Sequence, residues 1–262
     1  MIITLIVSTF NRPDALDLVL KSIENQTYLP DEVIIADDGS DNSTKSLISS
    51  YIKKSHLNII HSWQEDEGFR LSESRNRAIS LSSGEYLIII DGDMILDKNF
   101  VFDHLNNAKE GQFIQGGRVL LTENKTRHIL SEKRIKFSFY ESGLKNKKNF
   151  IRSKFLSNIF SSKSRNIRSI RGCNMSFYRK DCIFVNGFNN NIKGWGREDS
   201  DFAQRLINSG LYKLQLKFSA VQMHLWHPNA ETLLLNKNDD TLKKTISKKL
   251  IRCESGIKEL VL

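Results

Sequence analysis

Short apolar runs alternate with stretches of helical periodicity through the first hundred residues. Between them, apolar residues recur three or four positions apart, which predicts helices with one apolar face. Asn11 and Ser72 are candidate N-caps for two of these helices, and Pro13 suits a first turn. The alternation predicts an α/β fold with a largely parallel central sheet flanked by helices. The apolar runs predict buried strands at 2–7, 33–36, 57–63 and 86–90.

The pattern is weaker in the second half of the chain. Residues 133–171 combine Lys, Ser and Asn with scattered aromatics, which indicates a loop that could be mobile. Periodicity returns at 170–177, and the apolar spacing over 197–208 predicts a helix closed by Gly210. Residues 214–225 are expected to form one strand.

Length and composition allow one large domain, or one domain with an appendage. The chain has 262 residues, 39% hydrophobic and 26% charged, with only 3 prolines, so it can bury a full core and is not disordered. No apolar stretch is long enough for a membrane span, and the N-terminus reads as a strand rather than a signal peptide. The 3 cysteines lack metal-type spacing and suit reduced thiols in a cytoplasm.

Positive charge is concentrated in one segment. The formal net charge is +9, yet residues 133–171 hold 12 Lys and Arg against the single acid Glu141. This excess predicts an anionic partner: donor phosphates, a lipid surface, an acidic polysaccharide or nucleic acid. An apolar stripe beside basic residues would suit a helix on anionic lipid, and a solvated loop is an equal alternative. The stripe comprises Ile151, Phe155, Leu156 and Ile159, with Arg152, Lys154 and Lys163 nearby.

Two acidic pairs stand where predicted strands end. Asp91-Gly92-Asp93 follows the strand at 86–90, and Asp37-Asp38 follows the strand at 33–36. In an open α/β sheet the carboxyl ends of the strands form the ligand-binding edge, so both pairs should face one crevice. Such carboxylates hold Mg²⁺ or Mn²⁺ against a diphosphate, although Asp and Gly are also common in plain turns. Two such pairs together favour recognition of a nucleotide diphosphate.

The order of these motifs resembles the inverting family 2 glycosyltransferases. The resemblance covers residues 2–105 and lies in 7–12, 22–27, 32–40 and 91–93. Residues 66–70, followed by Arg75-Asn76, are similar to the chondroitin-polymerase-like branch. The resemblance implies a GT-A fold and a UDP-sugar donor. It also implies that the donor is bound by Thr9, Asn11, Arg12, Asp38, Arg70, Arg75, Asp91, Gly92 and Trp195.

A second resemblance lies in residues 171–177 and 194–201, which look like the C-terminal galactosyltransferase-type segment of β-galactosyltransferases and N-acetylgalactosaminyltransferases. It implies that Asp199 is the catalytic base, although this acid could simply stabilise a helix N-terminus. An inverting displacement independently requires a carboxylate that accepts the proton of the acceptor hydroxyl. Arg197 and Ser200 depart from the family's glycine and aspartate, which leaves the donor sugar open. The residues implied to contact the acceptor or sugar are Asn174, Trp195, Gly196 and Glu198.

The family also implies a metal held by Asp93 and by a histidine after the last expected strand. The family pattern is Met-x-x-His, whereas here Met223 is followed by histidine at one and at four residues. We favour His224, with His227 as the alternative ligand, for Mn²⁺ or Mg²⁺.

These features predict a metal-dependent, inverting hexosyltransferase with a nucleotide-sugar-binding half at 1–105 and an acceptor-binding and catalytic half at 106–235. A basic helical tail is expected at 236–262. The enzyme would transfer a hexose or N-acetylhexosamine from a UDP-sugar to a bacterial surface glycan, such as capsule or lipooligosaccharide, on an acceptor that could be lipid-linked. We expect a cytoplasmic protein, with peripheral membrane contact as an option. The alternatives are a sugar nucleotidyltransferase and a non-catalytic module for an anionic surface or nucleic acid, with nucleic acid disfavoured.

Overall fold

The computed structural model describes residues 1–228 and 231–260, and two sheets form its framework. The larger sheet has the order β3-β2-β1-β4-β10-β6-β11-β9, and β3, β2, β1 and β4 are parallel. Its strands are β1 (Ile3–Thr9), β2 (Glu32–Asp37), β3 (Ile59–Trp63), β4 (Tyr86–Asp91), β6 (Gln112–Gln115), β9 (Ser162–Ser164), β10 (Asn174–Tyr178) and β11 (Tyr212–Gln215). The smaller sheet, in the order β5-β12-β7-β8, contains β5 (Met94–Leu96), β7 (Val119–Leu121), β8 (Leu144–Lys145) and β12 (Gln222–His224).

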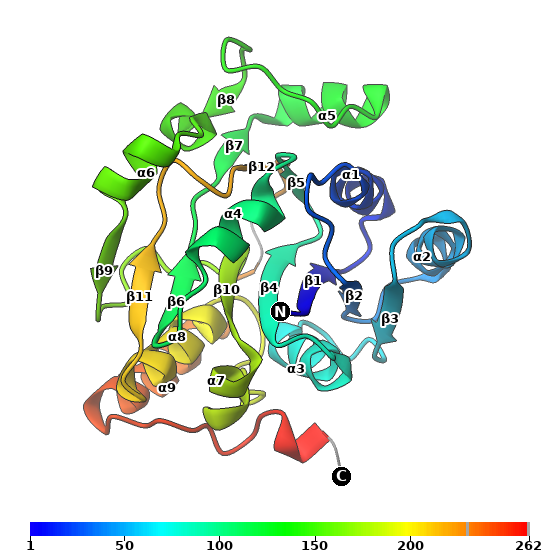
Figure 1. The fold of residues 1–262 in the computed structure, drawn as a ribbon. Coiled ribbons are helices and arrows are strands. Elements are labelled where there is room, and N and C mark those ends of the chain that lie inside the picture. Colours follow the sequence, from blue (N-terminus) through cyan, green and yellow to red (C-terminus); the bar gives the residue numbers. More distant parts are fainter. Residues whose placement is uncertain (229–230, 261–262) are drawn as a thin grey trace.

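Helices cover both faces of the larger sheet, with α1, α2 and α4 on one side and α3, α7 and α8 on the other (Figure 1). Side chains on β1 alternate between two apolar clusters, so that Leu5 and Val7 pack toward α1 while Ile6 packs with the cluster that contains Phe202 of α8. The helices are α1 (Pro13–Glu24), α2 (Asn42–Lys54), α3 (Leu71–Leu81), α4 (Phe100–Asn107), α5 (Glu123–Glu132), η1 (Lys147–Phe150), α6 (Lys154–Phe160), α7 (Arg179–Phe184), α8 (Glu198–Asn208), α9 (Leu235–Ser247) and η2 (Lys258–Leu260).

The predicted α/β class is confirmed, and β1 to β4 lie at the four predicted strands. Both predicted N-caps are wrong. Arg12 and Arg70 occupy the cap positions of α1 and α3, and neither side chain caps its helix. Asn11 instead accepts a hydrogen bond from the backbone N–H of Asp41, because it joins two loops at the strand ends. No helix among the described residues is both long enough and apolar enough to cross a membrane.

Three expectations for the second half need correction. Residues 214–225 do not form one strand, because a turn at 216–221 sends β11 and β12 into different sheets. The predicted loop at 133–171 contains β8, η1, α6 and β9. The helical part of the tail is α9 and the short η2, and residues 261–262 lie outside the described part of the chain.

A buried ion pair joins α8 to its surroundings. Asp201 is fully buried and accepts hydrogen bonds from Arg205 Nε at 2.9 Å and from the Thr245 hydroxyl of α9 at 2.6 Å. Arg205 Nη1 donates to the carbonyls of Val185 and Gly187 at 2.7 and 2.6 Å. Because almost every polar atom of the pair has a partner, the two charges can stay ionised inside the protein.

We predict that Asp201→Ala lowers the free energy of unfolding by about 3–5 kcal/mol, because it leaves the Arg205 guanidinium buried without its counter-charge. Urea denaturation followed by circular dichroism measures this. The control is Asp240→Ala, which removes a surface pair with Lys243 and should leave the midpoint unchanged. Equal midpoints for the two variants would contradict the assignment.

Candidate active site

The donor residues implied by the resemblance gather at the carboxyl ends of β1, β2 and β4. Thr9 ends β1, and its carbonyl accepts the backbone N–H of Asp38 at 3.1 Å. Gly92 follows β4, and its N–H donates to the Ser8 carbonyl at 2.6 Å. A Cβ on Gly92 would lie 2.8 Å from that carbonyl oxygen, so only glycine allows the acidic turn to approach β1 so closely.

Asp38 is held in one orientation by two hydrogen bonds. Its Oδ1 accepts from Gln64 Nε2 at 2.5 Å and its Oδ2 from the backbone N–H of Arg70 at 2.8 Å. Burial raises the pKa of Asp38 to about 6, although these two hydrogen bonds act in the opposite direction. The Arg70 side chain lies among Glu67 and Glu73 and does not reach the acidic turn after β4.

Asp93, His224 and His227 meet on one side of the acidic turn. The two histidine Nε2 atoms lie 3.4 and 3.6 Å from Asp93 Oδ2, and ligand atoms of all three residues lie within 4.8 Å of one another. Asp93 Oδ1 is buried, and no hydrogen-bond donor among the described residues reaches it. One carboxylate and two imidazoles form a donor set that suits a divalent metal ion, and an orphaned carboxylate oxygen is what a metal would satisfy.

The tautomer of His227 supports its use as a ligand. Its Nδ1 lies 2.7 Å from the Pro228 carbonyl, which can only accept a hydrogen bond, so Nδ1 is the donor there and Nε2 is the nitrogen that faces Asp93. Both candidate ligands, His224 and His227, are therefore close enough to Asp93 to bind the same metal ion with it. Arg12 Nη1 also lies 3.2 Å from Asp93 Oδ2. Burial is the largest single influence on the pKa of Asp93 and acts to raise it, but the hydrogen bond with His224 and the charges of His224, His227 and Arg12 together lower it, so the net shift is downward.

Arg75 lies at the centre of the site and is 1% exposed. Its Nε donates to the Ser8 hydroxyl at 3.1 Å, and its Nη2 donates to Asp91 Oδ1 at 2.9 Å. Its Nη1 lies 3.9 Å from Glu198 Oε1, and the guanidinium stands over the Phe188 ring. These contacts place Arg75 between the acidic turn after β4 and the first turn of α8, and its buried Nη1 has no hydrogen-bond partner among the described residues.

Glu198 and Asp199 form the first turn of α8, as predicted. Asp199 Oδ2 accepts the backbone N–H of Gly172 at 3.0 Å, and its Oδ1 accepts the Ser200 hydroxyl at 3.1 Å. Burial raises the pKa of Glu198 to about 7, and the neighbouring Asp199 adds to the shift. Burial also raises the pKa of Asp199, while Arg75 and the bond from Gly172 limit the rise. Two adjacent, partly buried carboxyls of this kind titrate as a pair.

Asn174 and Trp195 stand in different surroundings. Asn174 is fully buried, and its amide donates to the carbonyls of Gly117 and Ala220 while its oxygen lies 3.0 Å from His104 Nε2. Its side chain therefore faces the protein interior rather than the sugar site that the resemblance implied. Trp195 is 47% exposed on the loop that leads into α8, beside Gly196.

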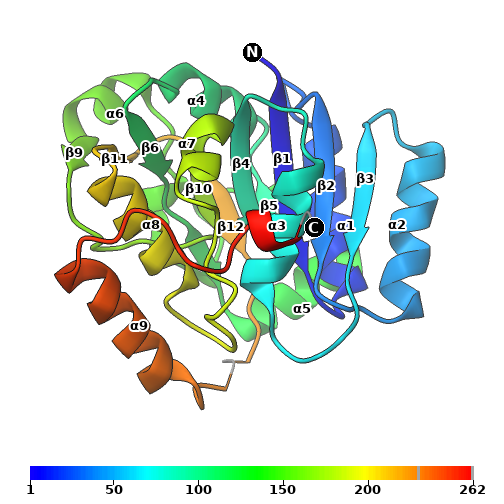
Figure 2. The same cartoon turned by 90° about the horizontal axis from the view of Figure 1, so that it is seen from below.

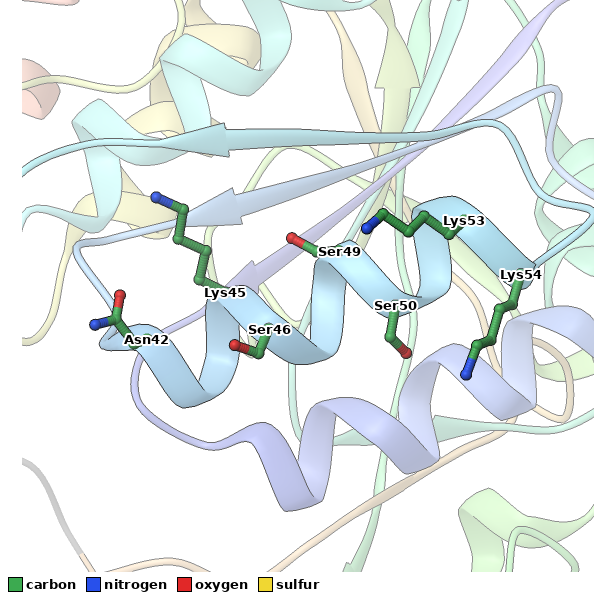
Figure 3. A pocket seen from close by; sticks show the side chains of 7 residues that line it. All are labelled: Asn42, Lys45, Ser46, Ser49, Ser50, Lys53 and Lys54. Carbon is green, nitrogen blue, oxygen red and sulfur yellow. The ribbon is translucent and has the colours of Figure 1, made fainter.

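Two surface hollows differ in their relation to these residues. One is lined only by residues of α2, among them Lys45, Lys53 and Lys54, and contains no predicted site residue (Figure 3). The other lies beside the metal ligands, has a volume of about 260 Å³, and is lined by Arg12, Glu123, Thr126, Arg127, Leu130, Trp226, His227 and Pro228.

Sequence reasoning missed two residues that shape the site. Ser8 lies inside a recognised motif, and its position one residue before the end of β1 is the signal that could have singled it out. Gly172 supplies the N–H that binds Asp199, and a Cβ on it would lie 2.6 Å from Arg75 Nη1. Its place next to the buried run at 173–177 is a signal for close backbone approach.

The chain belongs to glycosyl transferase family 2, whose model matches residues 4–181. A second model, described as the N-terminal domain of galactosyltransferase, matches residues 156–227. Both resemblances stated from the sequence are thereby confirmed.

Two relatives are similar to this chain over most of its length. The chondroitin synthase of Pasteurella multocida is 26% identical over 95% of this chain and 27% of its own length. The GalNAc(5)-diNAcBac-PP-undecaprenol β-1,3-glucosyltransferase of Campylobacter jejuni is 26% identical over 70% of this chain and 59% of its own length. The chain thus spans less than two thirds of either relative.

Solved structures share the fold, which is of the GT-A type. TarS 1-349 of S. aureus in complex with UDP-GlcNAc has a TM-score of 0.65 at 16% identity, covering 99% of this chain and 69% of TarS 1-349. The mannosyltransferase PcManGT of Pyrobaculum calidifontis, in complex with GDP-Man and Mn²⁺, has a TM-score of 0.61 at 17% identity, covering 97% of this chain and 65% of its own.

We predict that UDP binds much more weakly, by on the order of 10- to 100-fold, in Asp93→Ala than in the wild type when Mn²⁺ is present, because Asp93 would hold the ion that offsets the charge of the diphosphate. Titration calorimetry with and without a chelator measures this. Asp14→Ala is the control, since Asp14 is an exposed acid in the first turn of α1. If the wild type binds UDP equally well with and without the chelator, a metal ion takes no part in donor binding.

Proposed function

We propose that the chain is an inverting, metal-dependent glycosyltransferase that transfers a hexose or N-acetylhexosamine from a UDP-sugar to a hydroxyl of a bacterial surface glycan. One observation carries the proposal: Arg75 contacts both Asp91 of the donor edge and Glu198, which adjoins the candidate base Asp199. A nucleotide-sugar site and a general base are therefore neighbours, as a single displacement requires.

The reaction assigns one role to each group. Asp199 accepts the proton of the acceptor hydroxyl, whose oxygen bonds to the anomeric carbon while the bond from that carbon to the diphosphate breaks. The electron pair leaves with UDP. Asp93, His224 and His227 would hold a divalent ion, which offsets the charge of the departing diphosphate. The raised pKa of Asp199 makes it a stronger base than an ordinary aspartate.

The donor and acceptor classes rest on the relatives. TarS 1-349 binds UDP-GlcNAc, and the name of the Campylobacter relative describes a glucosyltransferase acting on an undecaprenol-linked glycan. Arg197 and Ser200 stand where the galactosyltransferase pattern has glycine and aspartate, so glucose, galactose and their N-acetylamino forms are all candidate donors. Family membership favours sugar transfer over nucleotidyl transfer, and release of UDP rather than pyrophosphate distinguishes the two.

We predict that Asp199→Asn lowers transfer on the order of 10²-fold or more while binding of UDP with Mn²⁺ stays close to wild type. Asparagine can still accept the Gly172 N–H, so the fold is kept and only the proton acceptor is lost. Coupled assays for UDP release measure turnover. Asp181→Asn, which changes an acid in the first turn of α7, is the control.

The pH profile gives the same hypothesis a second test. Asp199 must be deprotonated to act, and its pKa is raised, so transfer should fall as the pH drops through a value above the ordinary range of an aspartate. A folded Asp199→Asn protein that binds donor and transfers sugar within a few-fold of wild type would remove Asp199 as the base.

We also infer that the basic segment contacts an anionic membrane through α6. Phe155, Ile159 and Phe160 are 71, 57 and 49% exposed, although they are large apolar side chains on one short helix. Lys154 and Lys163 are exposed close by in the sequence, within a segment whose charge is almost entirely positive. Apolar insertion and attraction to anionic headgroups would act together at such a surface.

We predict that the protein sediments with vesicles that contain phosphatidylglycerol, more than with pure phosphatidylcholine, and that salt weakens the binding. Phe155→Ser with Ile159→Ser, and separately neutralisation of Lys145, Lys147 and Lys148, should each reduce it. Phe184→Ser is the control, because Phe184 is 56% exposed on α7 across the sheet. Unchanged sedimentation of both test variants would favour a passive solvated segment.

A further inference from the structure

The loop that carries Trp195 is held from outside by α9, the helix of the expected C-terminal tail, which no motif connected with the site. Figure 1 and Figure 2 show α9 beside α8 on the outer side of the molecule. Asn238 of α9 is 1% exposed, and its Nδ2 donates to the carbonyls of Lys193 and Gly196, both at 3.0 Å. These two carbonyls stand on either side of Gly194-Trp195 in the sequence, so the amide group of Asn238 holds both ends of this short loop.

The next residue of α9 holds the end of the same loop. Asp239 accepts a hydrogen bond from Arg197 Nε. Arg197 has a φ of +80°, a conformation that favours glycine, and it occupies a position where the family pattern has glycine. The ion pair with Asp239 gives this strained residue a partner that glycine would lack. Two successive residues of α9 thus fix the loop immediately before Glu198 and Asp199.

We propose that Asn238 is a positioning residue, which sets the backbone of the loop at 194–197 so that Trp195 and the first turn of α8 face the donor. This inference rests on the proposed function, because it assigns Asn238 a part in the same transfer site. Gly196 lies close to α9, since a Cβ on it would lie 3.0 Å from Leu235 Cδ1. Removing the Asn238 amide takes away both hydrogen bonds to the carbonyls of Lys193 and Gly196, so we expect the loop to loosen locally.

A merely structural role for Asn238 can be separated from positioning because α9 has other anchors. The Thr245 hydroxyl donates to Asp201, and Asn208 Nδ2 donates to the carbonyls of Thr245 and Leu250 at 3.3 and 2.8 Å. Asn208 is a matched control: its amide also donates to two carbonyls, but at the end of α9 remote from the loop. Asn208→Ala should loosen α9 without freeing residues 194–197.

The test compares Asn238→Ala, Asn238→Asp and Asn208→Ala in the full chain. Asp keeps the shape of Asn but has no N–H to donate, so it should behave like Ala. We expect both Asn238 variants to lower kcat for transfer by about 10-fold or more, with UDP and Mn²⁺ affinity near wild type, since small misplacements of reacting groups are costly. Asn208→Ala should lower the melting temperature comparably and leave kcat within a few-fold.

A second measurement does not depend on activity. With 5-fluorotryptophan incorporated, the ¹⁹F resonance of Trp195, assigned with Trp195→Phe, should shift or broaden in both Asn238 variants and stay in place in Asn208→Ala. If the wild type transfers no sugar, the proposed function fails while this resonance still tests the positioning. An unmoved Trp195 resonance, or kcat values that match those of Asn208→Ala, would overturn the role of Asn238.

Discussion

The arrangement of the site depends on one buried guanidinium, that of Arg75, which contacts residues from both halves of the chain. Arg75 reaches from α3 to Ser8 on β1, to Asp91 at the end of β4, and toward Glu198 at the start of α8. A buried cation is costly unless it is paired, so these groups cannot move apart without leaving the charge unsatisfied. Its single side chain therefore links the donor edge to the turn that carries the candidate base, although Asp91 and Asp199 are 108 residues apart in sequence.

The sheet explains why these groups can meet at one edge. β1, β2 and β4 are parallel, so Thr9, Asp37 and Asp91 end their strands side by side. β10 is antiparallel to β4, which brings the residues just before Asn174, including Gly172, to that same edge. The Gly172 N–H then binds Asp199. The reversal of strand direction at β10 thus joins the second half of the chain to the site of the first half.

The sequence could predict those features that local patterns encode. Apolar runs located β1 to β4, and acids after strands located Asp38 and Asp93, because both follow from burial and from the ligand-binding edge of a parallel sheet. The division of residues 214–225 into β11 and β12 of separate sheets was not predictable. Apolar and polar residues alternate through most of this segment, and that pattern does not reveal a turn made by residues with positive φ such as Phe218 and Ala220. The interior position of the Asn174 side chain depends on hydrogen bonds with His104, Gly117 and Ala220, which lie in three separate segments, and no spacing in the sequence records them.

The acids around Arg75 outnumber the single positive charge that it carries. Three acids, Asp91, Glu198 and Asp199, lie around Arg75. Among the described residues Arg75 is the only cation that pairs with this cluster, so the cluster holds more negative than positive charge when all its acids are ionised. Burial and mutual repulsion raise the pKa of Glu198 to about 7, and a proton shared in the Glu198–Asp199 pair relieves the excess. The proposed base therefore titrates as part of a pair, and its deprotonation depends on Glu198 as well as on the charge of Arg75.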